Sequence, residues 1–87
     1  EKMMSWNYRV IHQQIKGEEY YAIHEVYYEN LPDDDRIKGW TARAATPSGE
    51  SVVELKRDMQ HYRLALEKPV LEMAALQREA EKGSVQG

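Results

Sequence analysis

The chain of 87 residues contains no cysteine and no phenylalanine, and only 3 prolines and 5 glycines. Without cysteine, neither a disulfide framework nor a thiolate metal site can form. No apolar run reaches the roughly 18 residues that a membrane-spanning helix needs, and no basic start precedes an apolar core as in a signal peptide. The sequence therefore predicts a cytoplasmic protein that is neither exported nor inserted into a membrane.

An excess of positive charge is also missing, because 15 acidic residues outweigh 12 basic ones and leave a formal charge of −3. Proteins that bind nucleic acid more often carry a net basic face. Arg9, Lys38 and Arg43 with Trp40 would form a basic and aromatic patch, but the acidic loop and the acidic residues of the expected helix offset it. We therefore expect no nucleic-acid partner.

The size of the chain predicts one domain, which we place at residues 6–82. Apolar residues make up 41% of the sequence and charged residues 31%, which is typical of a folded globular domain. Residues 1–5 and 83–87 are expected to be tails that are disordered or not native to the protein. A domain this small buries a modest share of its surface, so its stability is expected to depend on a partner.

Three segments of the first half are rich in aromatic and β-branched residues, which indicates strands at 6–15, 19–28 and 37–45. A glycine-containing turn at 16–18 joins the first two strands as an antiparallel hairpin. Residues 29–36 hold a proline and three adjacent aspartates, which predicts a loop.

The second half predicts helices. Ser51 and Glu54 match a capping box, with the serine oxygen accepting an early amide and the glutamate reaching back. The residues that follow place an apolar stripe on one side of this helix, for packing on the sheet: Val52, Leu55, Met59, Tyr62 and Leu66. Pro69 is expected to end the helix and to open a second one at 69–82, which Gly83 terminates. The predicted fold is an α+β domain, a three-stranded antiparallel meander followed by a long amphipathic helix and a short C-terminal helix (βββαα).

Aromatic residues are the most informative feature of the predicted strands. Because alternate residues of a strand point to opposite faces, both faces of the sheet carry large rings, and one helix covers only one face. Six tyrosines in a chain without phenylalanine suit an interface better than a core, because each buried hydroxyl needs a partner. We therefore expect a homodimer through an aromatic sheet face or an edge strand, with these interface residues: Trp6, Tyr8, Tyr20, Tyr21, Tyr27, Tyr28 and Trp40.

The most distinctive polar residues in the sequence are His24 and Glu25. His12 would lie beside them if the hairpin register places the two histidines opposite each other. Two imidazoles could bind zinc or copper, but no third ligand is evident. Asp33, Asp34 and Asp35 lack the alternating spacing of a calcium loop. No serine has a base beside it. We therefore expect no catalytic residue, no metal and no cofactor.

Two runs, Trp6–Val10 and Tyr21–Tyr28, resemble a group of short bacterial proteins of unknown function, as do the Pro47–Ser51 turn and the segment Lys68–Leu71. The resemblance covers about residues 6–71 and implies a compact bacterial domain of the kind found in mobile gene cassettes. The order of elements also resembles, more loosely, HicB-type antitoxin domains. That resemblance implies an alternative function, an antitoxin-like or regulatory module that binds a partner protein.

Overall fold

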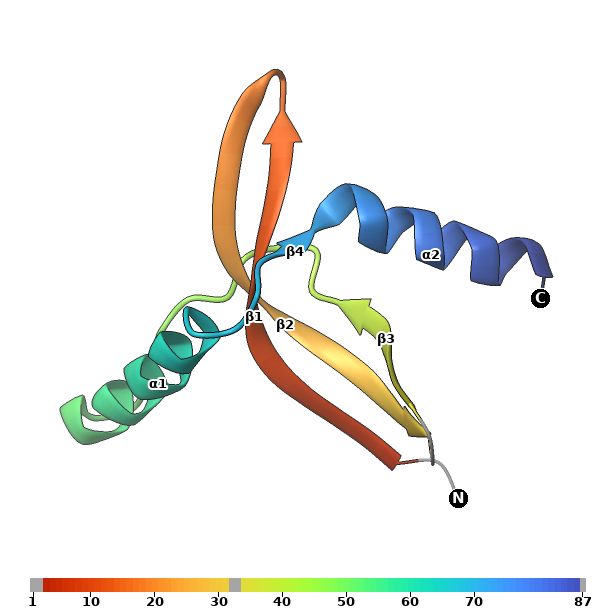
Figure 1. Cartoon of the computed structure of the whole chain (residues 1–87). Coiled ribbons are helices and arrows are strands. Elements are labelled where there is room, and N and C mark those ends of the chain that lie inside the picture. Colours follow the sequence, from red (N-terminus) through yellow and green to blue (C-terminus); the bar gives the residue numbers. More distant parts are fainter. Residues whose placement is uncertain (1–2, 32–33, 87) are drawn as a thin grey trace.

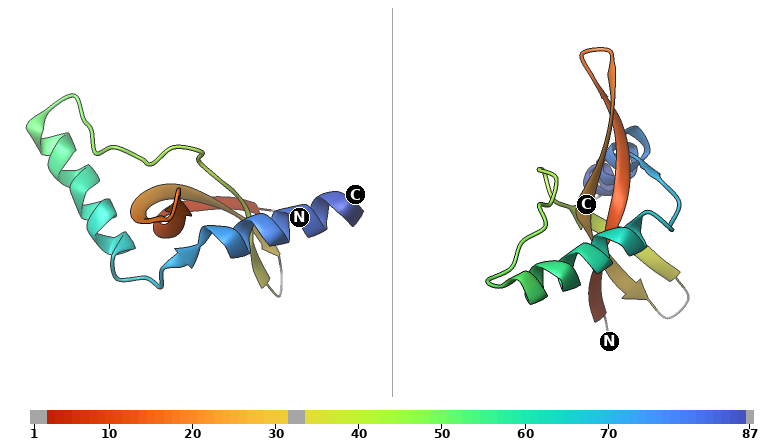
Figure 2. Two further views of the ribbon diagram at one scale, coloured as in Figure 1. Left: turned by 90° about the horizontal axis from the view of Figure 1, so that it is seen from above. Right: turned by 90° about the vertical axis from the view of Figure 1, so that its left-hand side faces the viewer.

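The computed structural model describes the backbone of residues 3–31 and 34–86, and the side chains of residues 5–29 and 36–81. Two long strands form a curled hairpin at the centre, and two helices leave it in different directions (Figures 1 and 2). The elements, in chain order, are β1 (Met3–Ile15), β2 (Glu18–Leu31), β3 (Asp34–Trp40), α1 (Val52–Ala65), β4 (Leu71–Glu72) and α2 (Met73–Gln86).

The hairpin follows from its turn. Lys16 has a φ angle of 52° and Gly17 one of 82°, and two successive positive φ angles match the twist of the flanking strands. Gly17 adopts this conformation without the strain that a Cβ atom would bring. The resulting antiparallel register runs from Ile15 opposite Glu18 to Met3 opposite Asn30. The hairpin predicted from the sequence is therefore present, and β2, with 14 residues, is four residues longer than the expected strand at 19–28.

The register assigns each side chain of the hairpin to one of two faces. Tyr8 and Val10 share one face of the hairpin with Glu25. Helix α1 packs on this face through Tyr62, so we call it the α1 face. Arg9 and Ile11 lie on the other, the α2 face. The hydrophobic core lies on the α2 face, where these side chains pack together: Ile11, Val26, Met73 and Leu76, with Tyr28, Ile37, Trp40 and Leu71 around them.

The predicted βββαα order is wrong, because a fourth strand lies between the helices. β4 pairs in parallel with β1 at Ile11 and His12, and the sheet has the mixed order β3-β2-β1-β4. The chain is extended here because Arg9 Nη2 donates to the Pro69 carbonyl at 2.7 Å and Leu71 packs against the core. The second helix therefore begins at Met73 rather than at residue 69, and it continues past Gly83 to Gln86.

The bounds of β3 also differ from the prediction. The expected loop at 29–36 is strand as far as Leu31 and again from Asp34; Pro32 and Asp33 lie outside the described residues. The expected strand at 37–45 ends at Trp40, although two later amides continue to bond to β2: Thr41 N to Glu25 O at 3.0 Å and Ala45 N to Ile23 O at 2.8 Å. Aspartate is a poor strand former in isolation, so pairing with β2 explains why β3 begins in the acidic run.

The start of α1 is as predicted. Ser51 Oγ accepts from Glu54 N at 3.1 Å, and Glu54 Oε1 reaches back to Glu50 N at 3.0 Å. Gly49 is needed beside this cap, since a Cβ atom there would lie 2.6 Å from Leu55 N.

The expected packing of the α1 stripe is wrong. The helix buries Tyr62 and Ala65, whereas the other stripe residues are exposed: Val52, Leu55, Met59 and Leu66. At roughly 100° per residue, the exposed stripe is rotated by roughly 80° from the side that meets the sheet. Contacts of Tyr62 and Asp58 with Tyr8 set this rotation.

The molecule is thin and spread out, with extents of 46 × 41 × 21 Å and a radius of gyration of 14.6 Å. A compact domain of this length has a radius of about 12 Å. Among the described residues, no helix combines the length and the apolar character needed to cross a membrane.

Candidate functional site

An aromatic cluster joins β1 to α1. The ring of Tyr8 lies 4.3 Å from that of Tyr62 and 5.3 Å from that of Trp6, which meets it edge-on at 81°. Trp6 and Tyr8 share a face because they are two residues apart on one strand. Trp6 closes one end of the cluster and remains 52% exposed.

Asp58 connects this cluster to the loop before α1. Its Oδ1 accepts from the Tyr8 hydroxyl at 3.3 Å, and its Oδ2 accepts from Ser48 N at 2.9 Å. Burial raises the pKa of Tyr8, and Tyr62 and the Asp58 carboxylate raise it further. Burial also raises the pKa of Tyr62. Both phenols are therefore neutral at pH 7 and act as hydrogen-bonding groups rather than as bases.

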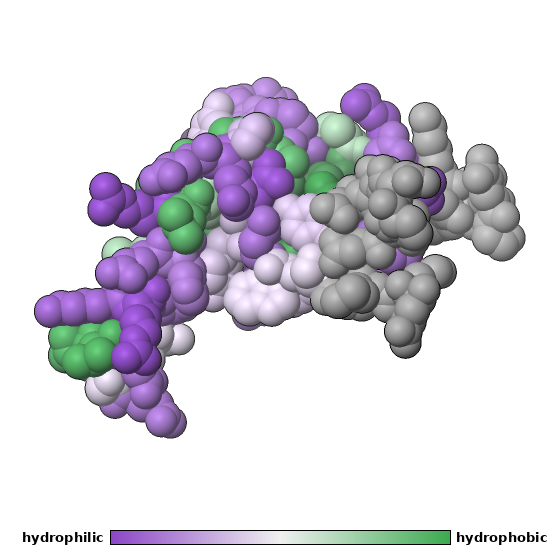
Figure 3. Space-filling view, turned by 60° about the horizontal axis from the view of Figure 1, so that its bottom comes forward, coloured by the Kyte–Doolittle hydropathy of each residue, from purple (hydrophilic) through white to green (hydrophobic). Residues whose placement is uncertain are grey.

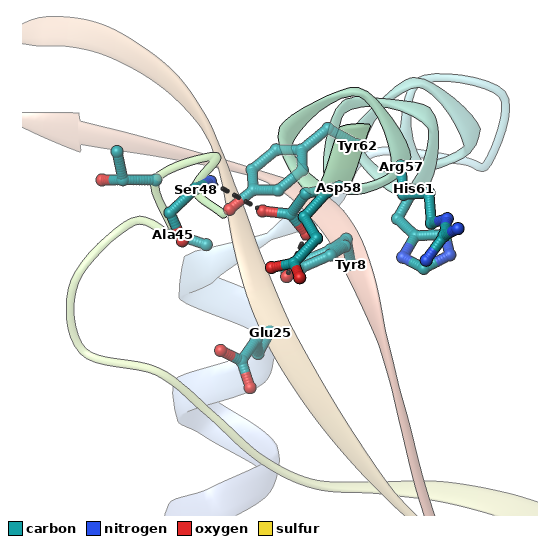
Figure 4. Close-up of a pocket in the computed structure, with 10 residues that line it drawn as sticks. Tyr8, Glu25, Ala45, Ser48, Arg57, Asp58, His61 and Tyr62 are labelled. Carbon is teal, nitrogen blue, oxygen red and sulfur yellow. Dashed lines mark hydrogen bonds between the residues drawn. The ribbon is translucent and has the colours of Figure 1, made fainter. Parts of the chain in front are cut away.

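An open cleft of about 450 Å³ lies beside the cluster, between α1, β2 and the loop before α1 (Figure 4). Carboxylates come from Glu25, Glu54 and Asp58, and Arg57 adds a cation. Much of this polar lining already has partners within the chain. Asp58 is bonded as described, and Glu25 Oε1 accepts from the Tyr27 hydroxyl at 2.9 Å. The cleft thus presents hydrogen-bonding groups, several of which are already paired within the chain.

A second hollow, which we call the β1–α1 groove, has a volume of about 310 Å³ and a more apolar lining. Trp6, Asn7 and Tyr8 form one wall, from the first half of β1. The last turns of α1 and the chain just after it form the other wall: His61, Leu64, Ala65 and Lys68. Leu64 is 52% exposed, like Trp6 across from it. The groove can therefore bury apolar side chains of another molecule.

His12 forms a separate polar cluster near β4. Its Nδ1 lies 2.6 Å from Glu72 Oε1, its Nε2 contacts the Glu19 carboxylate, and its ring stacks on Tyr21 at 4.6 Å. Hydrogen bonds that His12 donates to Glu72 first, and then to Glu19, raise the pKa of His12. Only the protonated ring can donate from both nitrogens to two carboxylates. The cluster is thus an ion pair that links β1, β2 and β4.

His24 lies elsewhere. The register places it opposite Arg9 on the α2 face, so it is not beside His12, and Glu25 points to the α1 face. His24 is 2% exposed, and its Nδ1 donates to the Thr41 carbonyl at 2.9 Å. The structure therefore separates the three candidate polar residues. Within the described part of the chain, no three histidine, aspartate or glutamate side chains are arranged to hold a metal ion.

The seven candidate interface aromatics occupy three environments. Tyr28 and Trp40 pack against the core, and Tyr8 and Tyr27 are half-buried on the α1 face. Large fractions of the other three are in contact with solvent: Trp6, Tyr20 and Tyr21.

Sequence reasoning missed the partners of these residues. Asp58 and Leu64 lie on the helix 50 or more positions from Tyr8, and Glu72 meets His12 from an element that was expected to be helical. Tyr62 gave a signal as a member of the apolar stripe, and Leu64 gave one as an apolar residue of the same helix that lies off the stripe and would suit a contact with a partner.

The chain matches no protein-family profile, no curated protein and no solved structure.

Proposed function

We propose that this chain is a non-enzymatic, cytoplasmic protein-interaction domain that forms a homodimer. The observation that carries the proposal is its surface area. The structure exposes 6986 Å², whereas a folded monomer of 10.2 kDa is expected to expose about 5,300 Å². The surplus is about 1,700 Å², which lies within the area that each partner buries in an obligate dimer.

The surplus is partly apolar, which supports association rather than a merely extended monomer. Apolar groups reach the surface in several places (Figure 3). They come from β1, from the hairpin tip, from the whole length of α1 and from the segment after it: Trp6, Ile15, Tyr20, Tyr21, Val52, Val53, Leu55, Met59, Leu64, Leu66 and Val70. Exposed apolar groups of this kind mark contact surfaces when they lie together, as Trp6 and Leu64 do in the β1–α1 groove.

The mass in solution tests the proposal. Sedimentation equilibrium at micromolar concentration should give about 20 kDa, twice the chain mass, as a two-fold assembly requires. A single species of 10.2 kDa at that concentration would remove the homodimer. Recovery of a stoichiometric second protein from the native host would then favour the antitoxin-like or regulatory module.

A further inference from the structure

The first half of β1 has one open edge. On one side β1 pairs with β2 along its whole length, and on the other β4 pairs with it only at Ile11 and His12. Across the described residues, no backbone hydrogen bond from another segment reaches this second edge between Met3 and Val10. Proteins usually block such an edge with a proline, a lysine or a bulge. Residues 3–8 contain no proline and no lysine, and their register with β2 is regular.

The open edge adjoins the β1–α1 groove. α1 lies on the β1 side of the hairpin, opposite β3, and diverges from the first half of β1 (Figure 1). The space between them is lined by the exposed side chains of Trp6 and Leu64, with the buried Ala65 beside them. An added strand would therefore find free backbone groups on one side and an apolar wall on the other, as in recognition by strand addition.

We propose that the occupant is the same edge of a second copy: two β1 strands pair antiparallel around a two-fold axis that passes near Trp6. This inference rests on the proposed homodimer and identifies its interface. Antiparallel pairing of a strand with itself is self-complementary, so each copy satisfies the open edge of the other and the assembly closes at two chains.

The two-fold axis also suits the side chains. An axis perpendicular to the sheet keeps even-numbered residues of both copies on one face. Trp6 of one copy thus meets Trp6 of the other, and each Tyr8 lies diagonal to the other copy's Trp6, next to both α1 helices. An exposed tryptophan at the centre of a buried patch is a typical energetic anchor of an interface. The joined sheet and the two grooves together account for part of the surplus surface.

Cysteine cross-linking tests the geometry, because the chain has no cysteine of its own. Ser5 is one residue from the proposed axis, so the two Ser5 positions should lie within about 10 Å. Gln13, on the same strand and the same face, is seven residues from the axis, and its two copies should be more than about 30 Å apart. A short bifunctional maleimide should therefore yield covalent dimer with Ser5→Cys and none with Gln13→Cys.

A paired substitution tests the energetics. Trp6→Lys should weaken self-association by at least about 30-fold in sedimentation, the effect of losing an interface anchor. Tyr20→Lys, which changes an aromatic of similar exposure at the far end of the hairpin, should leave the association unchanged. Circular dichroism of both variants checks that they remain folded.

The outcomes separate the interface from the homodimer itself. A stable dimer in which Ser5→Cys is not cross-linked, or in which Tyr20→Lys dissociates and Trp6→Lys does not, would overturn the β1 interface and leave the proposed function standing. A wild-type monomer would overturn both.

Discussion

Replacing one leucine in each helix by alanine tests which helix stabilises the fold. Leu76 of α2 is 8% exposed and belongs to the core, whereas Leu66 at the end of α1 is 67% exposed. The chemical change is the same at both sites, so the difference between the variants reports burial. The sequence pattern alone predicts a buried Leu66, which makes the comparison decisive for the rotation of α1.

The expected magnitudes follow from burial. Leu76→Ala leaves a cavity among Ile11, Val26 and Met73 and should lower the free energy of unfolding by about 3 kcal/mol. The whole domain is expected to have only about 4–13 kcal/mol, so much of its stability would be lost. Leu66→Ala should change it by less than about 0.5 kcal/mol, as is usual for an exposed position.

Urea unfolding followed by tryptophan fluorescence measures both values, because Trp40 packs against the same core. With a slope near 1.2 kcal/mol per molar urea, Leu76→Ala should lower the midpoint by roughly 2.5 M. Both variants must be compared at one protein concentration, since dimerisation shifts the midpoint. Equal losses in the two variants, or a larger loss for Leu66→Ala, would refute the assignment of the core to α2.

Substitutions at three further positions have defined outcomes. Ser51→Ala removes the acceptor for Glu54 N and should lower the free energy of unfolding by about 1 kcal/mol in urea titrations, while Ser51→Asp, which keeps an acceptor, should not. Because the fold raises the pKa of Tyr8, this phenol contributes stability below the ordinary tyrosine pKa near 10, and that contribution is lost as the pH rises above it. Tyr8→Phe should therefore make the loss of unfolding free energy at alkaline pH shallower. An identical loss in the variant and in wild type would contradict the burial of Tyr8. The raised pKa of His12 likewise gives stability that is present below about pH 6.5 and is lost as the pH rises through the folded-state value, so unfolding measured between pH 5 and 9 should show this dependence in wild type and lose it in His12→Gln.

The local features of the fold could be predicted from the sequence, because short-range chemistry determines them. Gly17 follows the first strand where a two-residue turn needs positive φ, and the pairing of Ser51 with Glu54 fixes the start of α1. Pro69 separates the helices as expected, since it cannot continue a helix. Each of these features depends on residues at most a few positions apart.

The remaining features depend on contacts between distant residues, and the local pattern does not encode them. β4 exists because Leu71 meets Ile11 across the sheet, although Val70–Leu76 reads as helical. The spacing of apolar residues in α1 identifies a stripe, but it does not say which side of the helix faces the sheet. The contact between Tyr62 and Tyr8 decides that side. For the candidate site, the sequence predicts Trp6 and Tyr8 as interface aromatics, which stays a prediction, whereas their grouping with Leu64 and Ala65 in one groove required the fold.

The two-residue turn at Lys16 and Gly17 also bears on how the molecule folds. The two central strands are joined by the shortest loop that a hairpin allows, so their pairing has little loop-closure entropy to overcome and is expected within microseconds. Ile11 and Val26, both fully buried in the final fold, come onto the same face of the hairpin in this first step. During synthesis, β1 and β2 can therefore pair before the segment that supplies β4 and α2 has left the ribosome.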